Sequence, residues 1–251
     1  MEAKRPVVLS LAGLDPSAGS GLLADIKTFE QHKVYGLGIC TAQTIQTAER
    51  FFSIRWEKTA DILEATKQML KHYEVKAVKI GIVENLQVLD EIVSFVHQTN
   101  PAIKIVWDTV IKSTSGFDFW KGEIDKSKLE NVLTKVFLIT PNYNEIQQLS
   151  AVADAKEAAS ELSASCNVLL KGGHNKKEEG TDYLFTQNKM EKLQPTVKEV
   201  FAKHGSGCVL SSAIAANLAL DADILTACKN AKIYIENFLN SNETLSGYHV
   251  A

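Results

Sequence analysis

Two patterns of hydrophobic residues alternate along most of the chain. Continuous apolar runs such as "VVLSLAG" (7–13) and "VKAVKIGI" (75–82) are typical of strands that are buried on both faces. Segments such as "KTADILEATKQMLKHY" (58–73) place apolar residues three or four positions apart, which predicts amphipathic helices. The chain therefore predicts strands and helices in alternation.

The same two patterns assign most of the remaining chain. Further strands are predicted at 36–46, 103–110, 136–142 and 167–173, with a hairpin at 181–196. Further helices are predicted at 21–36, 85–99, 142–150, 155–165, 207–220 and 222–240. Alternation with short links predicts a three-layer α/β/α sandwich with a mostly parallel central sheet. We expect residues 1–251 to form a single domain.

Composition and charge favour a cytoplasmic globular protein. The chain has 251 residues, of which 45% are hydrophobic, and a formal net charge of −3. It has no clustered basic face, so we expect no nucleic-acid partner. Its apolar runs are too short for a signal peptide or a membrane span, so we expect no membrane partner. The cysteines lack paired spacing and predict free thiols in a reducing compartment; they are Cys40, Cys166, Cys208 and Cys228.

Several common motifs are absent or incomplete. "GSGLLA" (19–24) matches the dinucleotide pattern G-x-G-x-x-A, but no carboxylate follows about 20 positions later. The chain contains neither G-x-x-x-x-G-K-[ST] nor G-x-S-x-G, which disfavours a Walker-type nucleotide site and a serine hydrolase. His204 and Cys208 are two possible metal ligands, too few for a zinc site.

The stretch "KHGSGCVLSSAIAANLA" (203–219) predicts an anion site at the start of a helix. Gly205 and Gly207 allow the backbone to adopt unusual conformations and to approach a ligand closely. The first N–H groups of a helix have no internal partner, and the helix dipole adds positive potential there. These properties suit a phosphate group. Small residues further along predict that this helix lies close to the sheet.

Cys208 would lie in the first turn of this helix. The helix dipole is expected to lower the pKa of the thiol, which would then accept a proton from a substrate hydroxyl. The alternative is that the glycines only shape a tight turn and that Cys208 is a small buried hydrophobic residue.

The residues of this turn resemble one enzyme family. "HGSGC" before "LSSAIAANLA" is similar to the "HGTGC-LSAA-AA" segment of the hydroxymethylpyrimidine/phosphomethylpyrimidine kinases, thiamin-biosynthesis enzymes of the ribokinase-like superfamily. "AGLDPSAGSGLLADIKTF" resembles that family's "AGTDPSGGAGIQADLKTF", and weaker matches follow in family order. The resemblance implies a ribokinase-like fold and a kinase that uses ATP and Mg²⁺. It implies that the enzyme phosphorylates the hydroxymethyl group of 4-amino-5-hydroxymethyl-2-methylpyrimidine, and often the monophosphate again.

The resemblance also implies residues that bind the pyrimidine. Asp25 falls on the family's substrate aspartate, and Gln46 on the side chain that pairs with the ring nitrogens. A glutamine carries both a donor and an acceptor, so it can satisfy a ring nitrogen and an exocyclic amine together. Without the resemblance, Asp25 would be a surface helix residue and Gln46 a polar strand end. The remaining substrate candidates are Gly13, Ser20, Ile82 and Val110.

A second implied group binds the nucleotide and the metal. The resemblance places Asn142, Glu145 and Lys171 near the ATP phosphates, with Asp108 and Glu145 as the expected Mg²⁺ ligands. Locally, Asn142 and Glu145 also match a helix capping box, and the two roles are compatible. Without the resemblance, Lys171 would be a solvated strand end.

The resemblance gives the turn its catalytic role. The main-chain N–H groups would hold the phosphoryl group as it gains charge during transfer. Cys208 stands where related sugar kinases have an aspartate, and the family resembled here uses cysteine. The catalytic candidates are Gly205, Ser206, Gly207 and Cys208.

Some residues depart from the family and bear on the choice of substrate. The family's "SGGAG" is "SAGSG" here, Ile82 replaces a methionine, and Lys203 stands where threonine is commoner. The stretch "KSTSGFDFW" (112–120) also departs. A pyridoxal or pyridoxine kinase on the same scaffold is one alternative, and a non-catalytic pyrimidine or nucleotide binder is another. A homodimer is expected from the resemblance alone.

Overall fold

The computed structural model describes residues 5–112, 117–120, 124–175, 178–187, 189–197 and 199–250. Its strands are β1 (Val7–Leu14), β2 (Tyr35–Gln46), β3 (Phe51–Trp56), β4 (Val75–Ile80), β5 (Lys104–Trp107), β6 (Leu138–Ile139), β7 (Asn167–Leu170), β8 (Asp182–Thr186) and β9 (Lys189–Leu193). Its helices are α1 (Gly21–Gln31), α2 (Thr59–His72), α3 (Leu86–Thr99), α4 (Lys126–Leu133), α5 (Tyr143–Leu149), α6 (Ala155–Leu162), α7 (Ser206–Ala219) and α8 (Ile224–Leu239).

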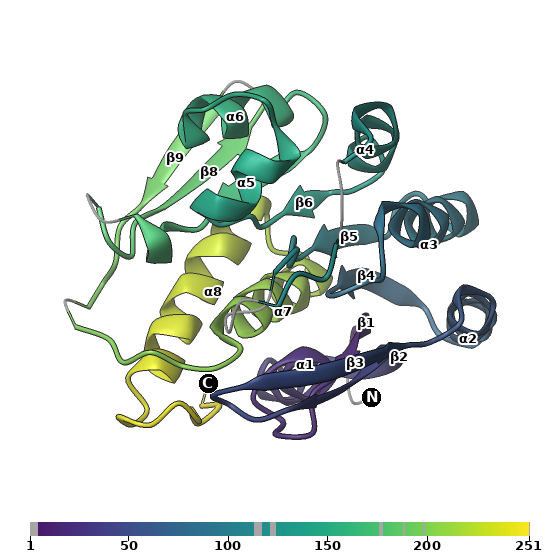
Figure 1. The fold of residues 1–251 in the computed structure, drawn as a ribbon, viewed down its shortest axis with the longest axis horizontal. Helices are drawn as coiled ribbons and strands as arrows, with labels where there is room; N and C mark the ends of the chain where they lie inside the picture. Colours follow the sequence, from purple (N-terminus) through teal and green to yellow (C-terminus); the bar gives the residue numbers. More distant parts are fainter. Residues whose placement is uncertain are drawn as a thin grey trace.

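The described strands form one nine-stranded sheet in the order β3-β2-β1-β4-β5-β6-β7-β8-β9 (Figure 1). The six central strands β2, β1, β4, β5, β6 and β7 are parallel to one another. The pairs β2–β3, β7–β8 and β8–β9 are antiparallel. The mostly parallel sheet and the hairpin predicted from the sequence are confirmed. The parallel centre brings the carboxyl ends of β1, β4, β5, β6 and β7 to the same edge.

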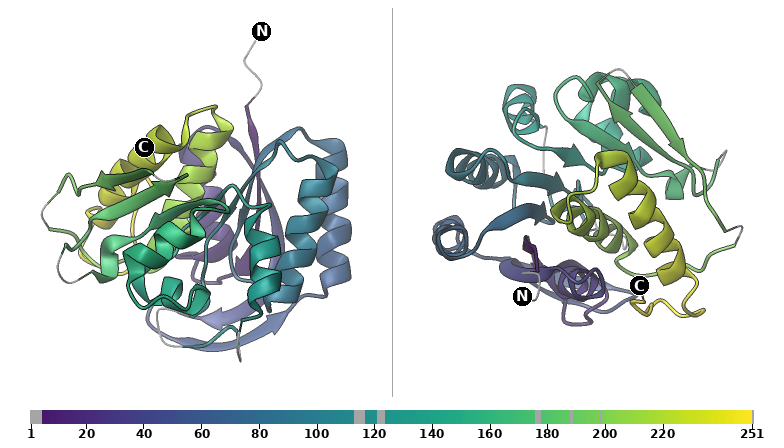
Figure 2. Two further views of the ribbon diagram at one scale, coloured as in Figure 1. Left: turned by 90° about the horizontal axis from the view of Figure 1, so that it is seen from above. Right: turned by 180° about the vertical axis from the view of Figure 1, so that it is seen from behind.

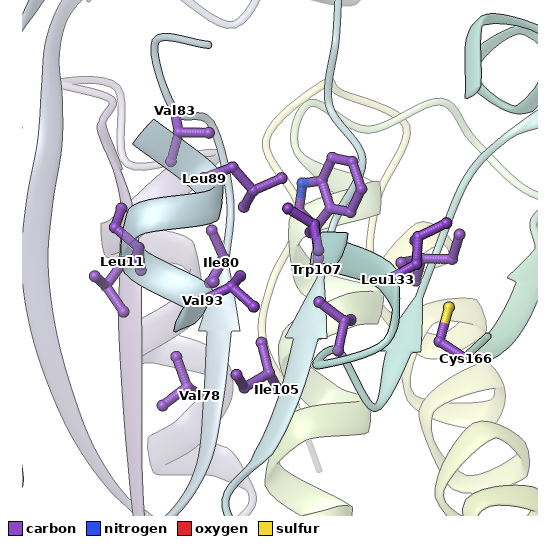
Figure 3. Packing of buried hydrophobic residues seen from close by; sticks show 14 of the residues in the cluster. Leu11, Val78, Ile80, Val83, Leu89, Val93, Ile105, Trp107, Leu133 and Cys166 are labelled. Carbon is purple, nitrogen blue, oxygen red and sulfur yellow. The ribbon is translucent and has the colours of Figure 1, made fainter. Parts of the chain in front are cut away.

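Helices cover both faces of this sheet (Figure 2). One cluster of buried apolar side chains joins the sheet to α2–α6, and a second joins it to α1, α7 and α8. In the first cluster, Leu11, Ile80 and Ile105 of three neighbouring strands meet Leu89 and Val93 of α3 (Figure 3). Successive strand residues point to opposite faces, so each buried strand supplies both clusters. The predicted three-layer sandwich is confirmed.

Strand β3 and helix α4 were not predicted from the sequence. β3 is an edge strand in which every residue keeps some exposure, so "FFSIRW" (51–56) lacks the continuous apolar run of a buried strand. α4 has only eight residues, and the hydrogen bond from Lys128 N to the Asp125 side chain marks its start. Short or exposed elements leave a weak periodic pattern, which explains why both were missed.

Helix α7 is enclosed on all sides. Its residues from Val209 to Ala219 are buried, and Ser211, Ser212 and Ala213 are 0% exposed. These small side chains let the helix lie against β1, β4 and β5, with α1 and α8 beside it. The close packing predicted for this helix is confirmed, and it holds the amino end of α7 at the carboxyl edge of the sheet.

An ion pair between Asp25 of α1 and Lys79 of β4 lies wholly inside the fold. Both side chains are 0% exposed, and Lys79 Nζ lies 2.9 and 3.0 Å from the two carboxylate oxygens. Ser10 and Ser212 donate to the same carboxylate at 2.6 and 2.7 Å. Burial opposes the charge of the ammonium, but Asp25 holds the pKa of Lys79 above its usual range. The network joins α1, β1, β4 and α7.

Replacing Lys79 by methionine would leave the Asp25 carboxylate buried without its counter-ion. We therefore expect the free energy of unfolding to fall by about 3–5 kcal/mol, measured by urea unfolding. Lys76→Met is the matched control, because Lys76 lies on the same strand and its ion pair with Glu74 is exposed. We expect the control to change stability by less than about 1 kcal/mol. Equal stability of the Lys79→Met variant and the wild type would contradict the role given to the pair.

Candidate active site

A cavity of about 1190 Å³ lies at the carboxyl edge of the sheet. Residues at or just beyond the ends of β1, β4, β5 and β7 line it, and so does the amino end of α7. The predicted site residues come from all these segments, and all of them except Asp25 line this cavity. The fold therefore brings together three groups of residues. They are the glycine turn (205–207), the charged corner (Asp108, Glu145 and Lys171) and the apolar wall around Gly13, Ile82 and Val110.

The glycine turn before α7 depends on an unusual backbone conformation. Gly205 has a φ of 76°, in the left-handed region that favours glycine, and α7 begins at Ser206. An ideal Cβ on Gly205 would lie 2.0 Å from Gly19 O, closer than any side chain allows. Val209 N makes the helical bond to Gly205 O, which leaves the N–H groups of 206–208 without intrahelical partners. The turn therefore offers donors and a positive dipole end to an anion.

Asp15 and His204 connect this turn to the first glycine loop. His204 Nε2 lies 2.8 Å from Asp15 Oδ2. Asp15 also accepts hydrogen bonds from the main-chain N–H and hydroxyl groups of Ser17 and Ser20. Burial would raise the pKa of Asp15, but these hydrogen bonds outweigh it and hold the pKa well below its usual range. The loop that carries Ser20 is thus fixed to the turn that carries Gly205.

Lys171 forms the centre of the charged corner. Its Nζ lies 3.1 Å from Asp108 Oδ1 and 3.7 Å from Glu145 Oε2. Burial opposes the ammonium charge, but the two carboxylates raise the pKa of Lys171. An ideal Cβ on Gly207 would lie 3.5 Å from Lys171 Nζ, so the ammonium lies beside the first turn of α7. The solvated position considered for Lys171 is wrong, because its side chain is only 14% exposed.

Asn142 and Glu145 form the predicted capping box at the start of α5. The Asn142 side chain accepts from Asn144 N and Glu145 N, and Glu145 Oε2 accepts from Asn142 N at 2.8 Å. Thr109 donates to the same Glu145 oxygen. Burial raises the pKa of Glu145 against the opposing effect of Lys171. Among the described residues no donor reaches Glu145 Oε1, so this oxygen remains available to a ligand.

The thiol of Cys208 differs from its prediction. Burial raises the pKa of Cys208 to about 11, because the lowering effect of Lys79 is opposed by Asp108 and Asp25. The position at a helix start does not compensate for lost hydration, so the predicted lowering of this pKa is wrong. The side chain is half-buried and lines the cavity as a neutral thiol at neutral pH.

Asp25 is buried beside the cavity. It is 0% exposed and so is not a surface residue, and it does not line the cavity. Both carboxylate oxygens bind Lys79, and the hydroxyl groups of Ser10 and Ser212 complete the site. The surface position considered for Asp25 is therefore wrong, and its role in binding the substrate stays a prediction. Lys79, which the sequence analysis did not single out, lines the cavity and connects Asp25 to it.

The apolar wall contains the other substrate candidates. An ideal Cβ on Gly13 would lie 2.4 Å from Ile82 Cδ1, so Ile82 packs directly over this glycine. Val110, Gln46 and Ser20 line the same cavity. A flat ring is a suitable ligand for such a surface, because a glycine backbone and aliphatic side chains permit close contact over a whole face.

Two aromatic residues of this wall were missed. Phe51 of β3 and Phe119 both line the cavity, and their ring centroids are 5.5 Å apart. Phe119 belongs to the stretch 112–120 that departs from the family, of which 113–116 lie outside the described residues. No periodic pattern distinguishes these side chains from ordinary loop and edge-strand residues.

Comparisons with known proteins identify the family of this chain. The model of the family described as "Phosphomethylpyrimidine kinase" matches residues 15–250. The chain belongs to the phosphomethylpyrimidine kinase family. A hydroxymethylpyrimidine/phosphomethylpyrimidine kinase of Aquifex aeolicus is 31% identical over 255 residues, covering 97% of this chain and 98% of that protein. The predicted family and the predicted phosphotransferase class are confirmed.

Solved structures show the same fold. A phosphomethylpyrimidine kinase from Clostridium difficile 630 is 30% identical with a TM-score of 0.78, covering 92% of this chain and 98% of that one. An ADP complex of Bacillus subtilis pyridoxal kinase is 25% identical with a TM-score of 0.81, covering 95% and 93% of the two chains. The structural similarity to this phosphomethylpyrimidine kinase and to this pyridoxal kinase confirms the predicted ribokinase-like fold.

The raised pKa of Cys208 predicts slow alkylation at neutral pH. Only the thiolate reacts, so the rate at Cys208 is expected to rise about tenfold per pH unit from pH 7 to 9.5, without a plateau. Iodoacetamide labelling, read by peptide mass, reports each cysteine separately. An unstructured cysteine peptide, with an ordinary pKa of about 8.5, is the control and approaches its plateau within this range. A plateau for Cys208 near pH 7 would contradict the raised pKa.

Proposed function

We propose that this member of the phosphomethylpyrimidine kinase family transfers the terminal phosphoryl group of ATP to 4-amino-5-hydroxymethyl-2-methylpyrimidine. The monophosphate is then the acceptor for a second transfer, as part of thiamin biosynthesis. One observation carries the proposal: the Lys171 ammonium lies beside the first turn of α7, in the same cavity as the apolar wall. The names of the relatives support the choice of acceptor.

Phosphoryl transfer depends mainly on positioning and on neutralising charge. The N–H groups of 206–208 would bind the oxygens of the migrating group, and Lys171 would supply a full positive charge beside them. These donors are fixed before the substrate arrives, because α7 is enclosed and its turn is held against Gly19. Donors that need no rearrangement favour the transition state over the ground state.

The acceptor would lie against the apolar wall with its hydroxymethyl group directed to the turn. Gly13 and Ile82 would contact a face of the ring, and Gln46 would bind its edge. The hydroxyl group would then lie near Cys208. A neutral thiol is compatible with this position, because the proton leaves the hydroxyl late in a loose transition state and needs no strong base.

The nucleotide would occupy the charged side of the cavity. Asn142, Glu145 and Lys171 would lie near its phosphates, as the family resemblance implies. The ADP complex of the similar Bacillus subtilis pyridoxal kinase supports a nucleotide on this fold. Opposite placement of nucleotide and ring leaves the turn of α7 between donor and acceptor, where a migrating group would pass.

Asp108 and Glu145 of the charged corner could hold Mg²⁺, which would neutralise negative charge on the phosphates of a bound nucleotide. No group of three or more His, Cys, Asp or Glu side chains in the described part of the chain forms a complete metal site. Mg²⁺ needs only one or two carboxylates when phosphate oxygens and waters supply the rest. Glu145 Oε1 is available, and Asp108 Oδ2 accepts only from Ser211 among the described residues and so keeps acceptor capacity.

Location and assembly remain predictions from the sequence. No helix in the described residues is long and apolar enough to cross a membrane. The cytoplasmic location is predicted from composition, and the homodimer is predicted from the family resemblance alone.

Incubation of the purified protein with Mg-ATP and the pyrimidine is expected to give the mono- and diphosphorylated products, measured by mass. Lys171→Met is expected to lower kcat by about 100-fold or more, because the corner loses its positive charge. Lys67→Met is the matched control, since Lys67 is 60% exposed on α2, and its kcat is expected to equal that of the wild type.

A parallel reaction with pyridoxal separates the alternatives. Product from pyridoxal alone would contradict the proposed acceptor and favour a pyridoxal kinase. Absence of product from both compounds, with nucleotide still bound, would favour a non-catalytic binder. Normal turnover by Lys171→Met would contradict the role given to the charged corner.

A further inference from the structure

Thr44 and Gln46 lie at the end of β2, where this strand extends beyond β1. Pairing with β1 ends at Gln43, and 44–46 pair with β3. The hydrogen bond between the Thr44 and Gln46 side chains places them on the same face, and both residues line the cavity. Gln46 was predicted from the sequence as a site residue, whereas Thr44 was not.

A chain of two hydrogen bonds connects Gln46 to the first glycine loop. Thr44 Oγ1 donates to Leu14 O at 2.9 Å, and Gln46 Nε2 donates to Thr44 Oγ1 at 2.9 Å. A hydroxyl group has one hydrogen, and a carbonyl oxygen can only accept. Because the Thr44 hydrogen is directed to Leu14, the hydroxyl can offer Gln46 only a lone pair. The NH₂ end of the Gln46 amide must therefore face Thr44.

This orientation decides what Gln46 offers to a ligand. Among the described residues no donor reaches Gln46 Oε1, so the carbonyl oxygen remains free to accept. The second N–H of the amide remains free to donate. A reversed amide would place Oε1 against the Thr44 lone pair, unless Thr44 gave up its bond to Leu14. The hydroxyl of Thr44 therefore selects one of the two amide orientations.

We infer that Thr44 determines specificity by fixing the Gln46 amide, so that the site accepts a ring with an amine beside an unprotonated ring nitrogen. A 4-aminopyrimidine presents a donor, its amine, next to an acceptor, its ring nitrogen. This edge matches the free acceptor and donor of the fixed amide. A 4-oxopyrimidine presents the reverse order, a carbonyl next to a ring N–H, and matches only the reversed amide. The inference rests on the proposed function, because it assumes that the ring lies against Gln46.

The test compares two acceptors with wild type, Thr44→Val, Thr44→Ala and Thr44→Ser. The acceptors are 4-amino-5-hydroxymethyl-2-methylpyrimidine and its 4-oxo analogue, and the readout is the ratio of their kcat/KM values. We expect the wild type to favour the amino ring by about 100-fold or more. Thr44→Val keeps the side-chain volume but frees the amide to turn, so the ratio is expected to fall at least about tenfold. Thr44→Ser keeps the hydroxyl, and its ratio is expected to stay near that of the wild type.

The outcomes separate this inference from the proposed function. An unchanged ratio in Thr44→Val and Thr44→Ala, with an active wild type, would overturn the inference and leave the proposed function in place. An equal fall of both kcat/KM values, with the ratio preserved, would likewise overturn it, because Thr44 would then be only structural. Phosphorylation of neither ring by the wild type would overturn the proposed function and the inference with it. Thr44→Ala provides the same test if Thr44→Val does not fold.

Discussion

The contact between Gly205 and Gly19 fixes the arrangement of the whole site. In the proposed function, the first glycine loop lies on the acceptor side of the cavity, and the turn before α7 supplies the N–H groups that would bind the phosphoryl group. Their approach excludes even a Cβ, and the bond from His204 to Asp15 holds the same two segments together. The enclosed helix behind the turn prevents it from shifting. Positioning, on which phosphoryl transfer chiefly depends, is therefore built into the fold.

Charges in and below the cavity are arranged in compensated groups. Lys171 lies between two carboxylates, and Lys79 is paired with Asp25 beneath the cavity. A buried ion without such a partner would lose several kcal/mol of hydration. The neighbouring carboxylates keep both ammonium groups charged at neutral pH. The positive charge of Lys79 near Cys208 is opposed by Asp108 and Asp25, so the thiol stays neutral. The same balance of burial and neighbouring charge thus explains why the two lysines are charged and the thiol is neutral.

Much of the fold and of the site could be predicted, for identifiable reasons. Buried parallel strands such as β1 leave continuous apolar runs, and the glycine turn leaves a short motif, so both were found from local patterns. The burial of Asp25 was not predicted because its partner Lys79 is 54 positions away, and neither spacing nor composition indicates such a pair. The pKa of Cys208 was predicted with the wrong sign because the helix end is visible in the sequence and the burial is not. The bond between Asp15 and His204, 189 positions apart, was hidden for the same reason.

A crystal structure with the pyrimidine and a non-hydrolysable ATP analogue tests the central claim most directly. We expect oxygens of the terminal phosphate about 2.7–3.2 Å from main-chain nitrogens of 206–208 and from Lys171 Nζ, with the acceptor hydroxyl on the opposite side of the phosphorus. A terminal phosphate bound elsewhere in the cavity, with these nitrogens left to water, would contradict the account.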